Sequence, residues 1–192
     1  MKEEKLTCKV RMKKYRSYRG ECGKVAPNII NRNFRTNSPN HKWTTDITEF
    51  HLFGRKLYLS PVLDMYNGEI ITYELSERPA LEQVIRMLQL AIDKTVHVSG
   101  IVLHSDQGWQ YQHKHYQQIL KDHGIIQSMS RKGNCLDNSV MENFFGLLKS
   151  ELLYLREFNS YEEFVEEIHK YIHYYNNNRI KAKLKGMSPV ES

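Results

Sequence analysis

The sequence predicts an α/β fold with a five-stranded mixed sheet, in which three antiparallel strands are followed by two parallel additions, flanked by helices. The first observation is that residues 43–75 hold three runs rich in aromatic and β-branched residues, joined by short turns, as in an antiparallel meander. The second is that a run with helical spacing precedes the continuous apolar stretch IVLHSD at 101–106. A helix that leads into a buried strand is a crossover unit, so we expect the fourth strand to join the sheet in parallel.

The first three strands are delimited by their turn residues. WTTDITEFHL at 43–52 is the first predicted strand, with Asp46 in its middle. The turn FGRK leads into LYLSPVLDMY at 57–66, and the turn YNGE leads into IITYEL at 70–75. Alternation along the second strand places four apolar residues on one face, namely Leu57, Leu59, Leu63 and Met65.

The rest of the chain alternates helices with strands. Residues 80–95 have helical spacing, residues 113–124 predict a second helix that ends at a glycine, and residues 125–130 predict the fifth strand. A last helix is expected over residues 161–178. Its core-facing residues are expected to be Phe164, Ile168, Tyr171, Ile172 and Tyr175, with Tyr174 also mostly in the core.

Between the fifth strand and the last helix lies GNCLDNSVMENFFGLLKSE, residues 133–151, which predicts a helix with one apolar stripe. Glu142 and Lys149 are seven residues apart, so they share a line at the edge of that stripe, about 10 Å from each other along the axis. A carboxylate at this edge is directed across the body of the domain. The stripe consists of Met141, Phe144, Phe145, Leu148, Leu152 and Leu155.

Length and composition are those of one ordinary domain. The chain has 192 residues, of which 40% are hydrophobic and 26% are charged. No segment approaches the roughly 20 apolar residues that a membrane helix needs, and no signal peptide is recognised. The three cysteines, Cys8, Cys22 and Cys135, are odd in number and form no CxxC pair, so we expect reduced thiols in a cytoplasmic protein.

The net charge of +6 is unevenly distributed. Residues 1–42 carry 12 Lys and Arg against 3 Asp and Glu, residues 43–178 carry 12 against 18, and residues 179–192 carry 4 against 1. We therefore divide the chain into a basic extended arm, an acidic core domain and a basic C-terminal tail. The arm interleaves tyrosines with cations, which indicates either a segment that follows a phosphate backbone or a solvated arm without structure. Its candidate phosphate-contacting residues are Lys13, Lys14, Arg16 and Arg19.

Three carboxylates are expected to converge at one edge of the sheet. Asp46 lies in the first strand, Asp106 lies at the carboxyl end of the fourth, and the helix of Glu142 packs on the sheet through its apolar stripe. Three converging acids repel one another unless a cation lies among them. Oxygen ligands suit Mg²⁺, with Mn²⁺ as a substitute, and two ions about 3.5–4 Å apart would support in-line displacement at phosphorus. Triads of acids are also common by chance, so spacing alone does not decide.

Three stretches resemble the catalytic boxes of DDE transposases related to retroviral integrases, namely WTTDITEF, LHSDQGWQY and GNCLDNSVMENFFGLLKSE. Asp46 and Asp106 are 60 positions apart, and 35 residues separate Asp106 from Glu142, a spacing characteristic of that superfamily. The group resembled is the large set of insertion sequences whose second reading frame encodes the catalytic protein. The resemblance implies an RNase H-like fold, Mg²⁺-dependent cleavage at the ends of a mobile element, and joining of the freed 3′ hydroxyl to new DNA. It makes Asp46, Asp106 and Glu142 the catalytic, metal-binding carboxylates.

The resemblance also suggests DNA contacts. Lys149 matches the basic position seven residues after the family's glutamate, so it could reach a phosphate; the alternative is a solvated lysine on the helix surface. The tail YNNNRIKAKLKGMSP resembles the family's closing motif, although Ile180 and Lys181 stand where many members have Pro and His. The remaining candidate DNA-contacting residues are Arg131, Lys132, Arg179, Lys181 and Lys183.

Several polar or small residues near these boxes have structural explanations. Asp64 ends a hairpin strand and is expected to cap the turn. Asp137 and Asn138 are good N-cap residues for the helix of Glu142. Gly146 costs roughly 1 kcal/mol of helix stability relative to Ala, which either close approach of DNA or another strand, or tight helix packing, could justify.

The partners that the resemblance implies are DNA, as element ends and as target, and further copies of the chain that bridge two ends. Related proteins usually begin with a helical region that contains a helix-turn-helix-like segment, and Met1 falls at its end. We therefore expect either a truncated chain or an upstream part that comes from a separate protein of the preceding reading frame. Two alternatives remain open, a catalytically silent DNA-binding remnant and an RNase H-like nuclease, and the basic arm and tail argue against the second.

Overall fold

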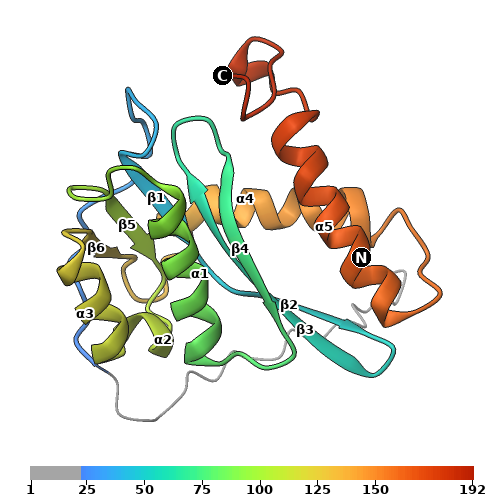
Figure 1. Ribbon diagram of the computed structural model, residues 1–192, viewed down its shortest axis with the longest axis horizontal. Helices are drawn as coiled ribbons and strands as arrows, with labels where there is room; N and C mark the ends of the chain where they lie inside the picture. Colours follow the sequence, from blue (N-terminus) through green and yellow to red (C-terminus); the bar gives the residue numbers. More distant parts are fainter. Residues whose placement is uncertain (1–22) are drawn as a thin grey trace, which may run out of the picture.

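One six-stranded sheet lies at the centre of the molecule (Figure 1), and the computed structural model describes residues 23–192. The strands are β1 (Lys42–Thr45), β2 (Thr48–Leu52), β3 (Arg55–Asp64), β4 (Ile70–Ser76), β5 (Val102–Ser105) and β6 (Ile126–Met129). Their order is β2-β3-β1-β5-β6, and β4 pairs with β3 off this path. β3 is antiparallel to β1, β2 and β4, whereas β5 is parallel to β1 and β6 is parallel to β5. The predicted mixed sheet with two parallel additions is therefore confirmed.

Helices cover both faces of this sheet. They are α1 (Leu81–Lys94), α2 (Trp109–Gln112), α3 (Lys114–Asp122), α4 (Ser139–Leu148) and α5 (Tyr161–Asn177). Two 3-10 turns, η1 (Cys135–Asn138) and η3 (Ala182–Leu184), and one π-helical turn, η2 (Lys149–Leu153), complete the elements. Residues of α1, α2 and α3 share one hydrophobic cluster with the sheet, and residues of α4 and α5 share the other, so the molecule has three layers.

The predicted first strand is divided in two, which raises the number of strands from five to six. β1 and β2 both pair with β3 in one register, in which Thr45 lies opposite Val62. Continued by one residue, that register puts Asp46 opposite Pro61, which has no N–H to donate to a ladder. Asp46 therefore lies in the break between β1 and β2, not in the middle of a strand as the sequence predicts.

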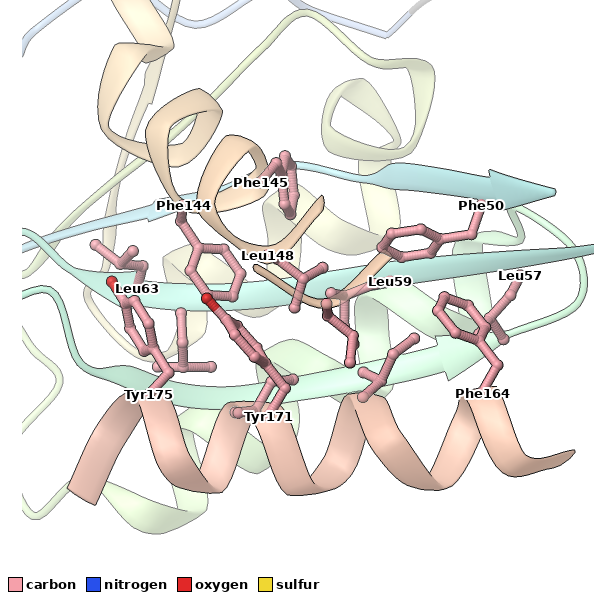
Figure 2. Close-up of a cluster of buried hydrophobic side chains, with 14 of the residues drawn as sticks. Phe50, Leu57, Leu59, Leu63, Phe144, Phe145, Leu148, Phe164, Tyr171 and Tyr175 are labelled. Atoms are coloured by element: carbon pink, nitrogen blue, oxygen red, sulfur yellow. The ribbon is translucent and has the colours of Figure 1, made fainter. Parts of the chain in front are cut away.

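The cluster between the sheet and the two C-terminal helices contains most of the predicted apolar residues (Figure 2). All five residues predicted to face inward from α5 are buried. Two other predictions are wrong: Leu155 is 77% exposed because the helical geometry stops at Leu153, and Tyr174 is 48% exposed on the outer side of α5. The labelled residues of the cluster are Phe50, Leu57, Leu59, Leu63, Phe144, Phe145, Leu148, Phe164, Tyr171 and Tyr175.

The last part of the predicted arm packs beside β6, the end strand of the sheet. The backbone N–H of Met129 donates to the carbonyl of Pro27 at 3.2 Å, and the N–H of Ile29 donates to Ser128 Oγ at 2.9 Å. Residues 23–41 therefore belong to the folded body. The described residues do not include Cys8, Cys22 or the arm candidates Lys13, Lys14, Arg16 and Arg19.

Between residues 23 and 192, none of the helices combines the length and apolar content that a membrane crossing requires.

Candidate active site

Two of the predicted carboxylates follow neighbouring parallel strands. Thr44 of β1 lies opposite His104 of β5, and Asp46 and Asp106 each come two residues later, just past the carboxyl ends of these strands. Residues at such positions meet at one edge of a sheet. The charge of Asp106 acts on Asp46, and both side chains are half-buried. The fold thus brings Asp46 and Asp106 together, as the sequence predicts.

Both carboxylate oxygens of Asp46 accept hydrogen bonds. The N–H of Ile47 donates to Oδ1 at 2.7 Å, and Asn138 Nδ2 donates to Oδ2 at 3.0 Å. Burial raises the pKa of Asp46 to about 8, and the charges of Asp106 and Glu142 add to that effect, while the two hydrogen bonds oppose it. A cation beside this carboxylate would favour its charged form.

Asp106 is held by the turn that follows it. The backbone N–H of Gly108 donates to Asp106 Oδ1 at 2.8 Å. A Cβ on residue 108 would lie 2.9 Å from that oxygen and 3.2 Å from Tyr111 Cδ2, so only glycine fits here without displacing a neighbour. Burial raises the pKa of Asp106, and the hydrogen bond from Gly108 lowers it. Asp106 is therefore a second carboxylate that is partly desolvated.

Glu142 lies on α4, and its side chain is exposed. Its charge raises the pKa of Asp46 less than the charge of Asp106 does. In the part of the chain that the structure describes, no three His, Cys, Asp or Glu side chains are grouped closely enough to hold a metal ion. The structure therefore places Asp46 and Asp106 together and Glu142 beside them on the open side.

The side chain of Asn138 does not cap α4, contrary to the prediction. Asn138 occupies the N-cap position, but no side-chain capping bond forms there. Instead its amide nitrogen donates to Asp46, and its amide oxygen accepts from Thr44 Oγ1 at 2.8 Å. The residue connects the start of α4 to the end of β1, a role that capping statistics could not reveal.

Asp137 has no capping role either, because its buried carboxylate accepts hydrogen bonds from two arginine side chains. Arg131 donates to it from Nε at 2.8 Å and from Nη2 at 2.7 Å, Arg32 donates from Nε at 3.0 Å, and Asn28 donates from Nδ2 at 2.9 Å. The Arg131 guanidinium holds the pKa of Asp137 well below its usual range. Arg131, a predicted DNA contact, is thus one half of an ion pair, with half of its side chain exposed, whereas Lys132 is exposed.

Lys149 is the first residue of the π-helical turn η2, directly after α4. The backbone N–H of Tyr154, which follows this turn, donates to the carbonyl of Lys149 at 2.9 Å. The lysine side chain is half-buried, and its Nζ lies 5.7 Å from the centre of the Phe50 ring. Burial lowers the pKa of Lys149, while the charges of Asp46 and Glu49 raise it. The lysine therefore lies on the side of α4 that faces the carboxylates.

The tail cations divide into two groups. Arg179 Nε donates to both carboxylate oxygens of Glu151, at 2.9 and 3.0 Å. Lys181 Nζ donates to Tyr175 OH at 2.8 Å, and burial lowers the pKa of Lys181 to about 8. Lys183 is exposed. Two of the three predicted tail contacts thus hold the tail against the body of the molecule, and one faces solvent.

Gly146 lies on the exposed side of α4, between Glu142 and Lys149. No atom within residues 23–192, apart from the backbone of the same helix turn, comes within 4 Å of a Cβ built at this position. Tight packing inside the chain therefore does not explain the glycine. The other predicted reason, close approach of DNA or of another strand, stays a prediction.

Several known proteins are similar to this chain. The integrase core domain family matches residues 36–135, and a second integrase core domain family matches residues 142–191. The chain is 56% identical to the InsK protein of insertion sequence element IS150 from Escherichia coli strain K12, over 97% of this chain and 66% of that protein. It is 55% identical to an uncharacterized transposase-like protein of Haemophilus influenzae, over 96% of this chain and 85% of that protein. The chain thus spans about two thirds of the Escherichia coli relative.

Among solved structures, the chain is similar to the catalytic core domain of HTLV-2 integrase in complex with magnesium. The TM-score is 0.62 at 18% sequence identity, over 82% of this chain and 98% of that chain. A likeness at this identity shows a shared fold, so the predicted RNase H-like fold is confirmed.

Proposed function

The chain belongs to the integrase core domain family, and we propose from this membership that it is the catalytic core of a bacterial insertion-sequence transposase. The reaction is cleavage at the ends of the mobile element, followed by transfer of the freed end into target DNA. Both steps are displacements at phosphorus, in which a new P–O bond forms as an existing one breaks. The attacking oxygen belongs to water in cleavage and to the 3′ hydroxyl in strand transfer.

The observation that carries this proposal is the pair Asp46 and Asp106 at adjacent carboxyl ends of β1 and β5. Both carboxylates are desolvated, and each is raised in pKa by burial. Among the ion pairs of residues 23–192, neither is neutralised by a lysine or an arginine. Two adjacent, half-buried acids without a cation are a costly arrangement that a metal site explains.

The donor chemistry fits Mg²⁺, with Mn²⁺ as a substitute, because these residues offer oxygen ligands only. Asp46 and Asp106 would hold the ions, with Glu142 completing the set from α4. When bound, two ions would activate the attacking oxygen and stabilise the leaving one. The chain's own residues orient the carboxylates through hydrogen bonds from Ile47, Asn138 and Gly108.

For DNA, we propose that Lys149 contacts a phosphate next to the carboxylates, since it lies on their side of α4. Lys132 and Lys183 are exposed and can add phosphate contacts. The other candidates within residues 23–192, Arg131, Arg179 and Lys181, hold partners inside the chain, so they shape the surface more than they bind DNA. Lys13, Lys14, Arg16 and Arg19 remain proposed contacts of the arm.

We further propose that the chain acts as a homo-oligomer that bridges two element ends in the cytoplasm, with or without a protein from the upstream reading frame. The proposed organisation is an arm at 1–42, of which residues 23–41 pack beside β6 as part of the folded body, a catalytic core at 43–178 and a tail at 179–192. Binding through phosphate contacts would be strongly dependent on salt.

The test is a strand-transfer assay with labelled element ends in Mg²⁺ or Mn²⁺, on this chain and on a version extended upstream. The proposal expects nicked ends and joined products that disappear with EDTA and with Asp106→Asn. A chain that shifts the DNA without nicking it, in both versions, would contradict the proposal.

A further inference from the structure

The segment just before α4 is attached to the sheet by two consecutive side chains. Asn138 is 5% exposed and bridges Thr44 Oγ1 and Asp46 Oδ2. The amide nitrogen faces Asp46 Oδ2, which is the orientation that an ionised, metal-binding Asp46 requires, because an ionised carboxylate only accepts hydrogen bonds. The amide oxygen is then left for the Thr44 hydroxyl. Both polar ends of Asn138 are therefore used, one on each side of the residue.

Asp46 needs such support because the sheet does not hold it. Its backbone lies in the break opposite Pro61, outside both β1 and β2. The direction of its carboxylate depends on two donors, the N–H of Ile47 and the amide of Asn138. Of these, only Asn138 comes from outside the break itself.

We propose that Asn138 is a positioning residue, which fixes the direction of the Asp46 carboxylate and so the affinity of the site for its divalent cation. The inference rests on the proposed function in that it takes Asp46 as a metal ligand. Residues that orient ligands in this way typically change metal affinity or activity by about 10–100-fold when they are removed.

Asp137 holds the positioning residue in place. It is 0% exposed and accepts side-chain hydrogen bonds from Arg131, from Arg32 and from Asn28. Arg32 and Asn28 belong to the segment that packs beside β6, and Arg131 precedes η1. Because Asp137 and Asn138 are adjacent, docking of this segment and orientation of Asp46 depend on one short piece of backbone.

The decisive experiment is a Mn²⁺ titration of the full chain without DNA, with the wild type, Asn138→Ala and Asn138→Asp. Asn138→Asp keeps the size of the side chain and an acceptor for Thr44, but it cannot donate to Asp46 when ionised. We expect both variants to bind Mn²⁺ about 10–100-fold more weakly than the wild type. The apparent Mg²⁺ requirement for strand transfer should rise in parallel, while affinity for the DNA ends stays within about twofold.

A matched control separates positioning from stability. Gln83 is a buried amide, 1% exposed, that donates to the carbonyls of Tyr58 and Glu74 on the opposite side of the sheet from α4. Gln83→Ala should lower the melting temperature and leave the Mn²⁺ affinity unchanged. Asp137→Asn should lower both, because it releases the backbone next to Asn138.

Mn²⁺ affinity within threefold of the wild type in both Asn138 variants would overturn the inference. A wild-type chain that binds no Mn²⁺ would overturn it as well. If the wild type binds Mn²⁺ but neither cleaves nor joins DNA, the proposed function fails, while the titration still decides the role of Asn138.

Discussion

The amide of Asn138 lies 3.0 Å from the carboxylate of Asp46 and ties the first residue of the α4 region to the break between β1 and β2. Four residues later, one helical turn, α4 carries Glu142. A single short segment thus supports one acidic residue of the site and supplies another. Movement of that segment would affect both carboxylates at once, so the geometry of the site depends on how η1 and α4 are docked.

Asp106→Asn should abolish cleavage and joining while it stabilises the metal-free chain. The carboxylate of Asp106 is half-buried beside Asp46, and asparagine keeps an oxygen that can accept from the N–H of Gly108. We expect the melting temperature in EDTA to rise by roughly 2–4 °C, the shift that about 1 kcal/mol gives in a domain of this size. DNA affinity should stay within about twofold. A lower melting temperature would contradict the burial argument, and activity in Mg²⁺ would contradict the metal proposal.

The stability of the metal-free chain should fall as the pH rises from about 7 to about 8. The pKa of Asp46 is raised in the folded chain, to about 8, whereas an unfolded Asp ionises near pH 3.9, so the folded state binds more protons in between and loses stability as pH rises. His104, whose pKa is lowered by burial, acts only below about pH 6.5. Lys181, whose pKa is lowered to about 8, opposes the fall increasingly as the pH approaches 8, so the slope should be steepest near pH 7. Urea midpoints in EDTA measure the slope.

Two conditions should flatten this pH dependence. Saturating Mg²⁺ neutralises the carboxylates, and Asp46→Asn removes the titrating group. A slope that persists unchanged in Asp46→Asn would show that other groups cause it.

Lys149→Ala should weaken DNA binding without destabilising the fold. The lysine is half-buried and its pKa is lowered by burial, so its removal releases a desolvation cost. One lost phosphate contact should reduce the slope of log K against log salt by about 1. Lys114→Ala, at an exposed position at the start of α3, is the control and should leave that slope unchanged. Equal slopes for both variants and the wild type would exclude Lys149 as a contact.

Arg179→Ala and Lys183→Ala should have different effects although both remove one tail cation. Arg179 is bonded to both oxygens of Glu151, so its loss should lower stability by about 1–2 kcal/mol and change the salt slope little. Lys183 is exposed, so its loss should reduce the slope and leave stability within about 0.5 kcal/mol. Denaturant titrations and DNA binding at several salt concentrations compare the two.

Gly146→Ala should stabilise the chain by about 0.5–1 kcal/mol, because the added methyl group meets no atom of the described chain and alanine favours the helix. We expect the same variant to bind DNA more weakly, since the glycine lies between Glu142 and Lys149 on the open face. Unchanged DNA affinity together with higher stability would mean that DNA does not approach this position.

The adjacency of Asp46 and Asp106 could be predicted from the sequence because a crossover helix requires β5 to be parallel to a neighbour. The split of the first strand could not. WTTDITEFHL is continuous in its β propensity, and the interruption comes from Pro61 in a different strand, which only the pairing register brings opposite Asp46.

The roles of Asp137 and Asn138 were also hidden from local reasoning. Both are favoured residues at a helix start, and capping is the contact that sequence neighbours can supply. Apart from Arg131, which lies six residues before Asp137, their partners include Arg32 and Thr44, 105 and 94 positions away. Long-range polar contacts of this kind leave no periodic signal, unlike the apolar faces of α4 and α5, which spacing predicted correctly for all but Leu155 and Tyr174.

The segment that packs beside β6 has a consequence for self-association. β6 ends the sheet, and an uncovered end strand offers free backbone groups on which a second molecule can add a strand. Here the carbonyl of Pro27 accepts a hydrogen bond from the N–H of Met129, and the proline has no N–H that it could donate on the outer side. This part of the edge is therefore covered from within the chain, so the homo-oligomer proposed above would assemble through other surfaces.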